Sequence, residues 1–170
     1  MPPAKGRMGY TTEIPPAKSR AQIYELLDSA GAHQISIGTN GQDAIAAFAL
    51  MGRMIRVSQP LPVQPETPRI RTAGGRNQHT GRDPWVLHDQ EERRRWRMLY
   101  RIIELQLELI KDEVLDIDDA FMPFILLPDN SVVRDHARPT IAETYESGQM
   151  PASILPVPSP VKVIALGERT

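Results

Sequence analysis

The spacing of apolar positions predicts a first helix over residues 19–31. In this stretch the apolar side chains fall at i, i+3, i+4 and i+7 and form one face of a helix: Ile23, Leu26, Leu27 and Ala30. Ser19 and Gln22 have the spacing of a capping box, which indicates that the helix begins there. Gly31 can take the left-handed conformation that ends helices.

Alternating and turn-forming residues predict a small antiparallel sheet around this helix. Ile35 and Ile37 alternate with polar neighbours, and Asn40-Gly41 favours a tight hairpin turn with a strand returning from about Asp43. Residues 44–51 are continuously apolar and fit either a strand or a buried helix. The preceding turn, and a second turn expected at Gly52-Arg53 before a strand over 54–57, favour a strand. With a short edge strand at 11–14, the fold class is α+β, in the order β-α-β-β-β over residues 11–58.

A long helix with two apolar faces is predicted to begin at Pro84, with Asp83 as its cap, or near Asp89, and to run to about Val114. The first face consists of Trp96, Leu99, Tyr100, Ile103, Leu107, Ile110 and Val114. The second consists of Met98, Ile102, Leu105 and Leu109, and an acidic row separates the two: Glu104, Glu108 and Asp112. Both faces need cover, so we expect the sheet to cover one, and the C-terminal segment or another subunit to cover the other.

The rest of the chain is predicted to be irregular apart from one short helix. Residues 59–83 read as a Pro-rich and then basic linker, and residues 1–10 and 151–170 as flexible or extended tails, with one edge strand possible at 161–166. The helical unit 84–150 is expected to complete the same core. Within it, residues 121–127 form a buried segment interrupted by Pro123, and residues 128–130 form a turn. A last helix is expected to open at Pro139 and to close at Gly148.

The C-terminal third carries a distinctive pattern. It reads Phe124-Ile125-x-Leu127-Pro128-Asp129, then Pro139-x-Ile141-x-x-x-Tyr145-x-x-Gly148-x-Met150-Pro151 and Ile154-Leu155-Pro156. This pattern resembles a group of small uncharacterised proteins from bacteriophages and prophages, in which a β-α-β-β part precedes a long charged helix. The resemblance covers about residues 10–156, and Asn130-Ser131 departs from the Asn/Asp-Gly of the group. It implies a bacterial-virus origin and transfers no functional residue.

Composition narrows the classes of function. The 170 residues include no cysteine, which excludes disulfides, thiolate metal sites and cysteine nucleophiles. No apolar stretch is long enough to span a bilayer and no signal peptide is recognisable, so we expect a cytoplasmic protein without a membrane partner, in the host cytoplasm if viral. The net charge of −1 conceals a split, because residues 1–101 carry a net +6 and residues 102–170 a net −7. Such asymmetry is typical of contact with nucleic acid or another polyanion, and the alternative is that the two halves mingle on one folded surface and cancel.

The sequence contains no catalytic signature and implies no cofactor. It has no Gly-rich phosphate loop, no nucleophile elbow and no zinc-protease motif, and its four histidines share no metal-ligand spacing. The acidic run that follows the long helix resembles a Mg²⁺ or Ca²⁺ site only superficially, and a solvated helix end explains it better: Glu113, Asp116, Asp118 and Asp119. We therefore expect a non-enzymatic protein without a metal.

The constellation that stands out is basic. It combines the loop residues Arg69, Arg71, Arg76 and Arg82 with the helix residues Arg93, Arg94, Arg95, Arg97 and Arg101. Guanidinium groups bind phosphates, and Trp96 could stack on an unpaired base. Against this, Trp96 lies on the apolar face, and Asp89, Glu91 and Glu92 are spaced to pair with the arginines. The first hypothesis is a phage-type accessory protein that binds nucleic acid. The alternative is a protein–protein interaction module, either an oligomeric assembly component or an inhibitor of a host or rival factor, that uses the second apolar face and the Pro-rich tails.

Overall fold

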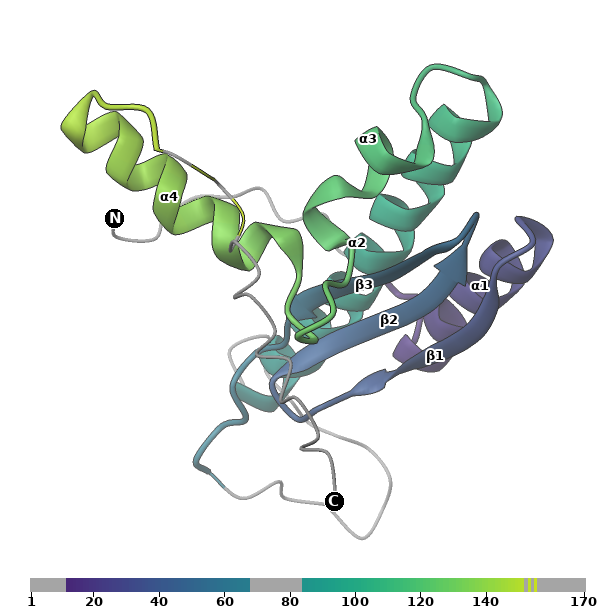
Figure 1. Cartoon of the computed structure of the whole chain (residues 1–170). Coiled ribbons are helices and arrows are strands. Elements are labelled where there is room, and N and C mark those ends of the chain that lie inside the picture. Colours follow the sequence, from purple (N-terminus) through teal and green to yellow (C-terminus); the bar gives the residue numbers. More distant parts are fainter. Residues whose placement is uncertain (1–11, 68–83, 152, 154, 156–170) are drawn as a thin grey trace, which may run out of the picture.

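The computed structural model describes residues 12–67 and 84–151 together with residues 153 and 155. Its elements are α1 (Pro16–Ser29), β1 (His33–Thr39), β2 (Asp43–Leu50), β3 (Arg53–Pro60), α2 (Pro84–Lys111), α3 (Ile117–Phe121), the 3-10 helix η1 (Met122–Phe124) and α4 (Val133–Ser147). Figure 1 shows α1 and α2 on one face of the sheet, α3 beside α2, and α4 extending away from the rest. The predicted α+β class is confirmed.

The N-terminus of the described chain differs from the prediction. α1 begins at Pro16 and not near Ser19, because a proline at the first helical position has a suitable φ and no N–H that needs a partner. Ser19 is fully buried inside the helix and caps nothing. The described part of the expected strand at 11–14 is not a strand, since the Ile14 N–H is donated to Thr12 Oγ1 (3.2 Å) and two prolines follow. The observed order is therefore α-β-β-β.

The predicted end of the first helix is confirmed. Gly31 takes a φ of +79°, and its N–H donates to the Asp28 carbonyl while the Ala32 N–H reaches back to the Leu27 carbonyl. These two bonds form a Schellman motif, which satisfies carbonyls that the helix end leaves free.

The sheet has the order β1-β2-β3 with both pairs antiparallel. Residues 43–50 form its central strand, which settles the choice between strand and helix in favour of the strand. Asn40 shapes the first turn as predicted, since its Oδ1 accepts the N–H groups of Gln42 and Asp43 at 3.0 and 2.7 Å. The second turn consists of Met51 and Gly52, both at positive φ, so Arg53 already belongs to β3.

The hydrophobic core lies between the sheet and α2. Alternate residues of β2 and β3 face the helices, and Phe48 pairs with Ile55 in the register. The first apolar face of α2 is buried on them at Trp96, Leu99 and Ile103, with Tyr100, Leu107 and Ile110 packed at its edge. α2 ends at Lys111, three residues before the predicted end, because the chain turns into the left-handed region at Glu113 (φ +57°). Val114 is consequently outside the helix and 63% exposed.

The C-terminal segment completes one edge of the sheet. Phe121 packs edge-on against Phe48, with ring centroids 5.7 Å apart. The Leu126 N–H then donates to the Met54 carbonyl at 2.8 Å, which extends the pairing beyond β3. The predicted buried segment 121–127 is thus buried at Phe121 and half-buried or exposed elsewhere.

α4 begins at Val133, six residues before the predicted start at Pro139. The Asp135 carboxylate accepts the Val132 N–H (3.3 Å) and helps to start the helix there, so Pro139 lies inside it. The predicted end at Gly148 is confirmed, with a φ of +67°. Several predicted segments lie outside the described residues: the tail at 1–10, most of the tail at 151–170 with its strand at 161–166, and the basic half of the linker. No described helix has the length and apolarity to cross a bilayer.

Candidate nucleic-acid interface

The five helix arginines predicted to contact phosphate lie in the middle of α2: Arg93, Arg94, Arg95, Arg97 and Arg101. One of the predicted acidic partners, Glu91, forms ion pairs with two of them. Glu91 accepts from Arg94 at 3.1 Å and from Arg95 at 2.7 Å. Because a single carboxylate serves two guanidinium groups, these three side chains together keep a net positive charge. All three side chains are half-buried, which restricts how far they can move.

Arg97 is held by neutral groups. Its Nη1 donates to Gln22 Oε1 on α1 at 2.8 Å, and its guanidinium lies 4.0 Å from the centroid of the Tyr100 ring. The Tyr100 hydroxyl donates to Glu104 Oε1 at 2.5 Å, and this bond raises the pKa of Tyr100 above its ordinary value. Arg97 is therefore positioned by an amide and an aromatic face.

Arg20 of α1 adds a cation that the sequence pattern did not single out. Its guanidinium lies 5.3 Å from the centroid of the Trp96 ring. α1 and α2 pack against each other, so Arg20 on α1 and Arg97 on α2 belong to the same packed pair of helices. The signal for Arg20 lay in tertiary packing, because nothing in the local sequence relates residue 20 to residue 96.

The remaining residues of the predicted site are Trp96, the loop arginines and Arg101. Trp96 is only 1% exposed and belongs to the core, so the predicted stacking of its ring on a base is wrong. The reason is its place on the apolar face of α2, which the sheet and α1 cover. Arg69, Arg71, Arg76 and Arg82 lie outside the described residues. Arg101 is exposed on α2.

The predicted second apolar face of α2 is only partly covered. Ile102 packs against the core cluster and Leu109 is half-buried, while Met98 and Leu105 are 36% and 54% exposed. α3 packs against α2, as expected if the C-terminal segment covers part of this face. The apolar surface that remains is narrower than the sequence predicts.

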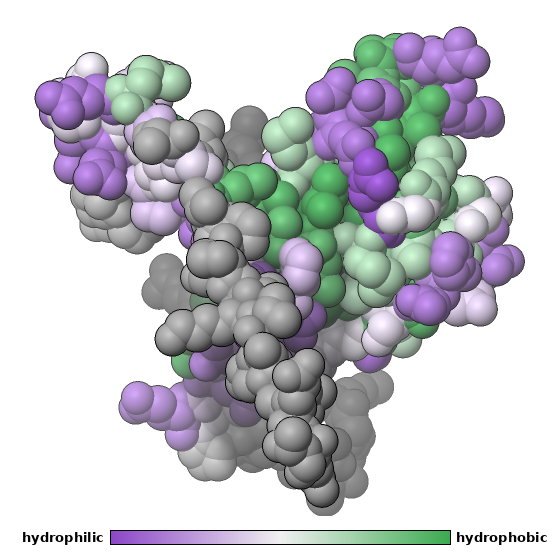
Figure 2. Space-filling model, in the orientation of Figure 1, coloured by the Kyte–Doolittle hydropathy of each residue, from purple (hydrophilic) through white to green (hydrophobic). Residues whose placement is uncertain are grey.

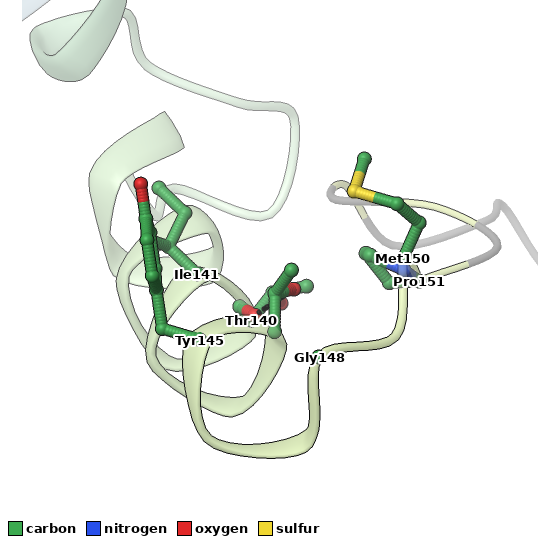
Figure 3. A pocket seen from close by; sticks show the side chains of 7 residues that line it. Thr140, Ile141, Tyr145, Gly148, Met150 and Pro151 are labelled. Atoms are coloured by element: carbon green, nitrogen blue, oxygen red, sulfur yellow. Dashed lines mark hydrogen bonds between the residues drawn. The ribbon is translucent and has the colours of Figure 1, made fainter.

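α4 carries a separate apolar hollow. None of its residues is buried, and Tyr145 is 87% exposed. Figure 3 shows Ile141 and Tyr145 on the helix, and Met150 and Pro151 on the segment that returns after Gly148. Together with Thr140 and Thr144 they line a space of about 430 Å³.

One group of potential metal ligands was missed in the sequence. His88, Asp89 and Glu92 on α2 bring one ligand atom each within 4.8 Å of one another. The sequence pattern that could have revealed this group is a histidine with carboxylates at i+1 and i+4. The spacing between histidines does not reveal it, because the group contains only one histidine. The His88 ring also meets the Trp85 ring edge-on at 5.5 Å, and its Nδ1 lies 3.3 Å from Asp89 Oδ1. These half-buried groups could hold a divalent cation with water completing its shell.

Ser131, His136 and Asp129 also lie close together, without the geometry of a catalytic triad. The Ser131 hydroxyl is 2.7 Å from His136 Nε2, but it donates to Asp129 Oδ1 at 2.5 Å. Asp129 approaches the same Nε2 atom (3.5 Å), whereas a triad carboxylate binds the opposite ring nitrogen. The bonds from Ser131 hold the pKa of Asp129 below its ordinary value. The cluster stabilises the turn before α4.

The acidic run after α2 has structural contacts. Asp116 caps α3 by accepting the Asp119 N–H at 2.8 Å. Asp118 accepts two hydrogen bonds from Arg53, at 2.7 and 2.9 Å, and these bonds lower its pKa. Two of the four carboxylates in this run, Asp116 and Asp118, therefore have hydrogen-bond partners within the protein and need no bound cation.

Comparison with known proteins adds no assignment, because no protein-family model, curated protein or solved structure matches this chain.

Proposed function

We propose that this chain is a non-enzymatic accessory protein of phage type that binds the phosphate backbone of nucleic acid through the α1–α2 surface around Arg20 and Arg97. The observation that carries the proposal is the environment of these two cations. Both are positioned by neutral groups: Gln22 and Tyr100 for Arg97, and Trp96 for Arg20. Their positive charges are therefore ready to meet an external anion.

Two further arginines add positive charge on the same helix. Arg94 and Arg95 share one carboxylate, so they contribute more positive charge than Glu91 cancels. A guanidinium group can donate two parallel hydrogen bonds to one phosphate group. Release of the counterions condensed on the nucleic acid then drives its association with the protein. With Trp96 buried, the surface offers contacts to the backbone and no base-stacking platform from that residue. We therefore expect binding with little sequence preference.

A charge-matched pair of variants tests the proposal. Arg20→Gln with Arg97→Gln should weaken binding to a fluorescein-labelled random-sequence duplex about tenfold at low salt, because two charged hydrogen-bond donors are lost. The control, Lys111→Gln with Arg138→Gln, removes the same net charge from other parts of the chain. Fluorescence anisotropy measures both, and circular dichroism melts verify folding. Equal losses in the two variants, or none in the first, would contradict the proposal.

A second candidate function is protein interaction or self-association through α2 and α4. The exposed Met98 and Leu105 on α2 favour it, as does the exposed Tyr145 on a helix that buries none of its residues. An exposed apolar patch often marks an interface. If two copies paired through α2, the pair would also carry the basic surface twice.

A further inference from the structure

The C-terminal ends of α1 and α2 enclose an apolar groove away from the basic surface. It has a volume of about 580 Å³. Its apolar lining comes from three elements and the turn between β2 and β3: Leu26, Leu50, Met51, Leu107 and Ile110. A helix pair with such a floor can receive the apolar face of a third helix.

The groove continues into a second hollow of about 380 Å³, which shares Met51 and Ile110 with the first. Val114 and Leu115 add apolar surface there, and both Val114 and Met51 are 63% exposed. Figure 2 shows apolar surface where α2 passes into α3, bordered by hydrophilic side chains. The lining on α2 runs from Glu104 to Lys111, which is about two helical turns.

The rim of this groove is acidic. Glu104, Glu108, Glu113 and Asp116 line the two hollows, against a single cation, Lys111. The C-terminal ends of α1 and α2 also lie there, and a helix C-terminus carries partial negative charge. The surface therefore favours a positively charged occupant.

Met51 is the least expected residue of the groove. It takes a φ of +47° in a two-residue hairpin turn, where glycine or asparagine is strongly favoured. A left-handed backbone is unfavourable for an L-residue that carries a Cβ. A strained position that nonetheless carries a large exposed apolar side chain indicates a role for that side chain.

We propose that this groove docks a basic amphipathic helix of a partner protein. The apolar floor would take residues at i, i+3, i+4 and i+7 of that helix, and its lysines or arginines would meet Glu104, Glu108 and Glu113. The groove lies on the C-terminal side of Arg97, because its lining on α2 runs from Glu104 to Lys111, about 10 to 20 Å along the helix from Arg97.

The test uses two labelled model peptides of about three helical turns that carry the same leucine pattern, one with lysine and one with glutamate at the polar positions. We expect the full-length protein to bind the lysine peptide and not the glutamate peptide. Glu108→Lys and Met51→Asn should each weaken that binding at least about threefold. Glu143→Lys on α4 makes the same charge change away from the groove and should leave it unaltered.

Three outcomes would overturn the proposal. The first is equal binding of both peptides, and the second is an equal loss in the Glu143→Lys control. The third is a dimer in size-exclusion chromatography with light scattering that Glu108→Lys dissociates, because a second copy would then be the occupant. Shifts of the Ser29 and Lys111 amide signals on peptide addition, measured by NMR, would support docking at this site.

Discussion

At the scale of single residues, the described chain contains a small set of strained or charged positions that relate structure to function. Met51 and Asn130 both take positive φ, at +47° and +70°. Asparagine tolerates this conformation, so Asn130 suits its turn before α4. Methionine does not tolerate it well, which makes Met51 the position where stability and function are expected to conflict.

Met51→Asn should stabilise the fold by about 0.5–1 kcal/mol, because asparagine accepts the left-handed backbone at lower cost. Urea denaturation measures the change. Met54→Asn is a matched control, since Met54 lies nearby in the extended β3 strand. That variant should lower stability instead. If Met51→Asn destabilises the protein as much as Met54→Asn does, the strain assigned to residue 51 is absent.

The Arg53–Asp118 pair predicts a pH effect. The two hydrogen bonds from Arg53 lower the pKa of Asp118 from its ordinary value. The folded-state pKa therefore lies below the unfolded one, so the stabilising contribution is complete above the unfolded pKa. It is lost as the pH falls through the folded-state pKa. Both side chains are nearly half exposed, so the contribution to stability is small.

Carboxyl-carbon NMR titration should place the pKa of Asp118 below the ordinary value of about 3.9 for aspartate. In Arg53→Gln the pKa should return toward that value. An Asp118 pKa that does not respond to Arg53→Gln would show that the pair does not persist in solution.

At the scale of elements, the amphipathic pattern of α2 determined most of its placement. Its first apolar face packs on the sheet and on α1, as the spacing of Leu99 and Ile103 indicates. Its second face is shared between the core, at Ile102, and solvent, at Met98 and Leu105. This residual face is where α2 could associate with another copy.

If α2 mediates self-association, Leu105→Asp should convert an oligomer into a monomer, because a charge would be buried in the contact. Size-exclusion chromatography with light scattering gives the mass in solution. Val63→Asp introduces the same charge at an exposed position outside the helices and should not change the mass. A wild-type monomer would remove the basis for this candidate function.

The elements that the sequence predicts correctly have strong local signals. Asn40-Gly41 marked the first hairpin, and Gly31 and Gly148 marked two helix ends. The errors arose where competing local signals were equally plausible: Ser19 and Pro139 each looked like helix starts, but α1 begins at Pro16, and α4 begins at Val133 with Asp135 in its first turn. The acidic groove and the pairing of Arg20 with Trp96 depend on which elements pack together, so no local pattern could reveal them.

At the scale of the whole molecule, the opposite charges of the two halves of the sequence are also separated along α2. The basic stretch 93–101 lies in the middle of the helix, and the acidic groove lies at its C-terminal end. α1 runs beside α2 with its C-terminus at the same groove. The helix pair therefore presents a positive surface and a negative surface at separate places, which fits two different partners.

The salt dependence of nucleic-acid binding tests the central claim most directly. The observed association constant of the wild-type protein for a random-sequence duplex would be measured by anisotropy at several salt concentrations. If two to four arginines contact phosphates, the logarithm of this constant should fall against log salt concentration with a slope of about −2 to −4. A slope near zero, or no binding at the lowest salt concentration, would contradict the account.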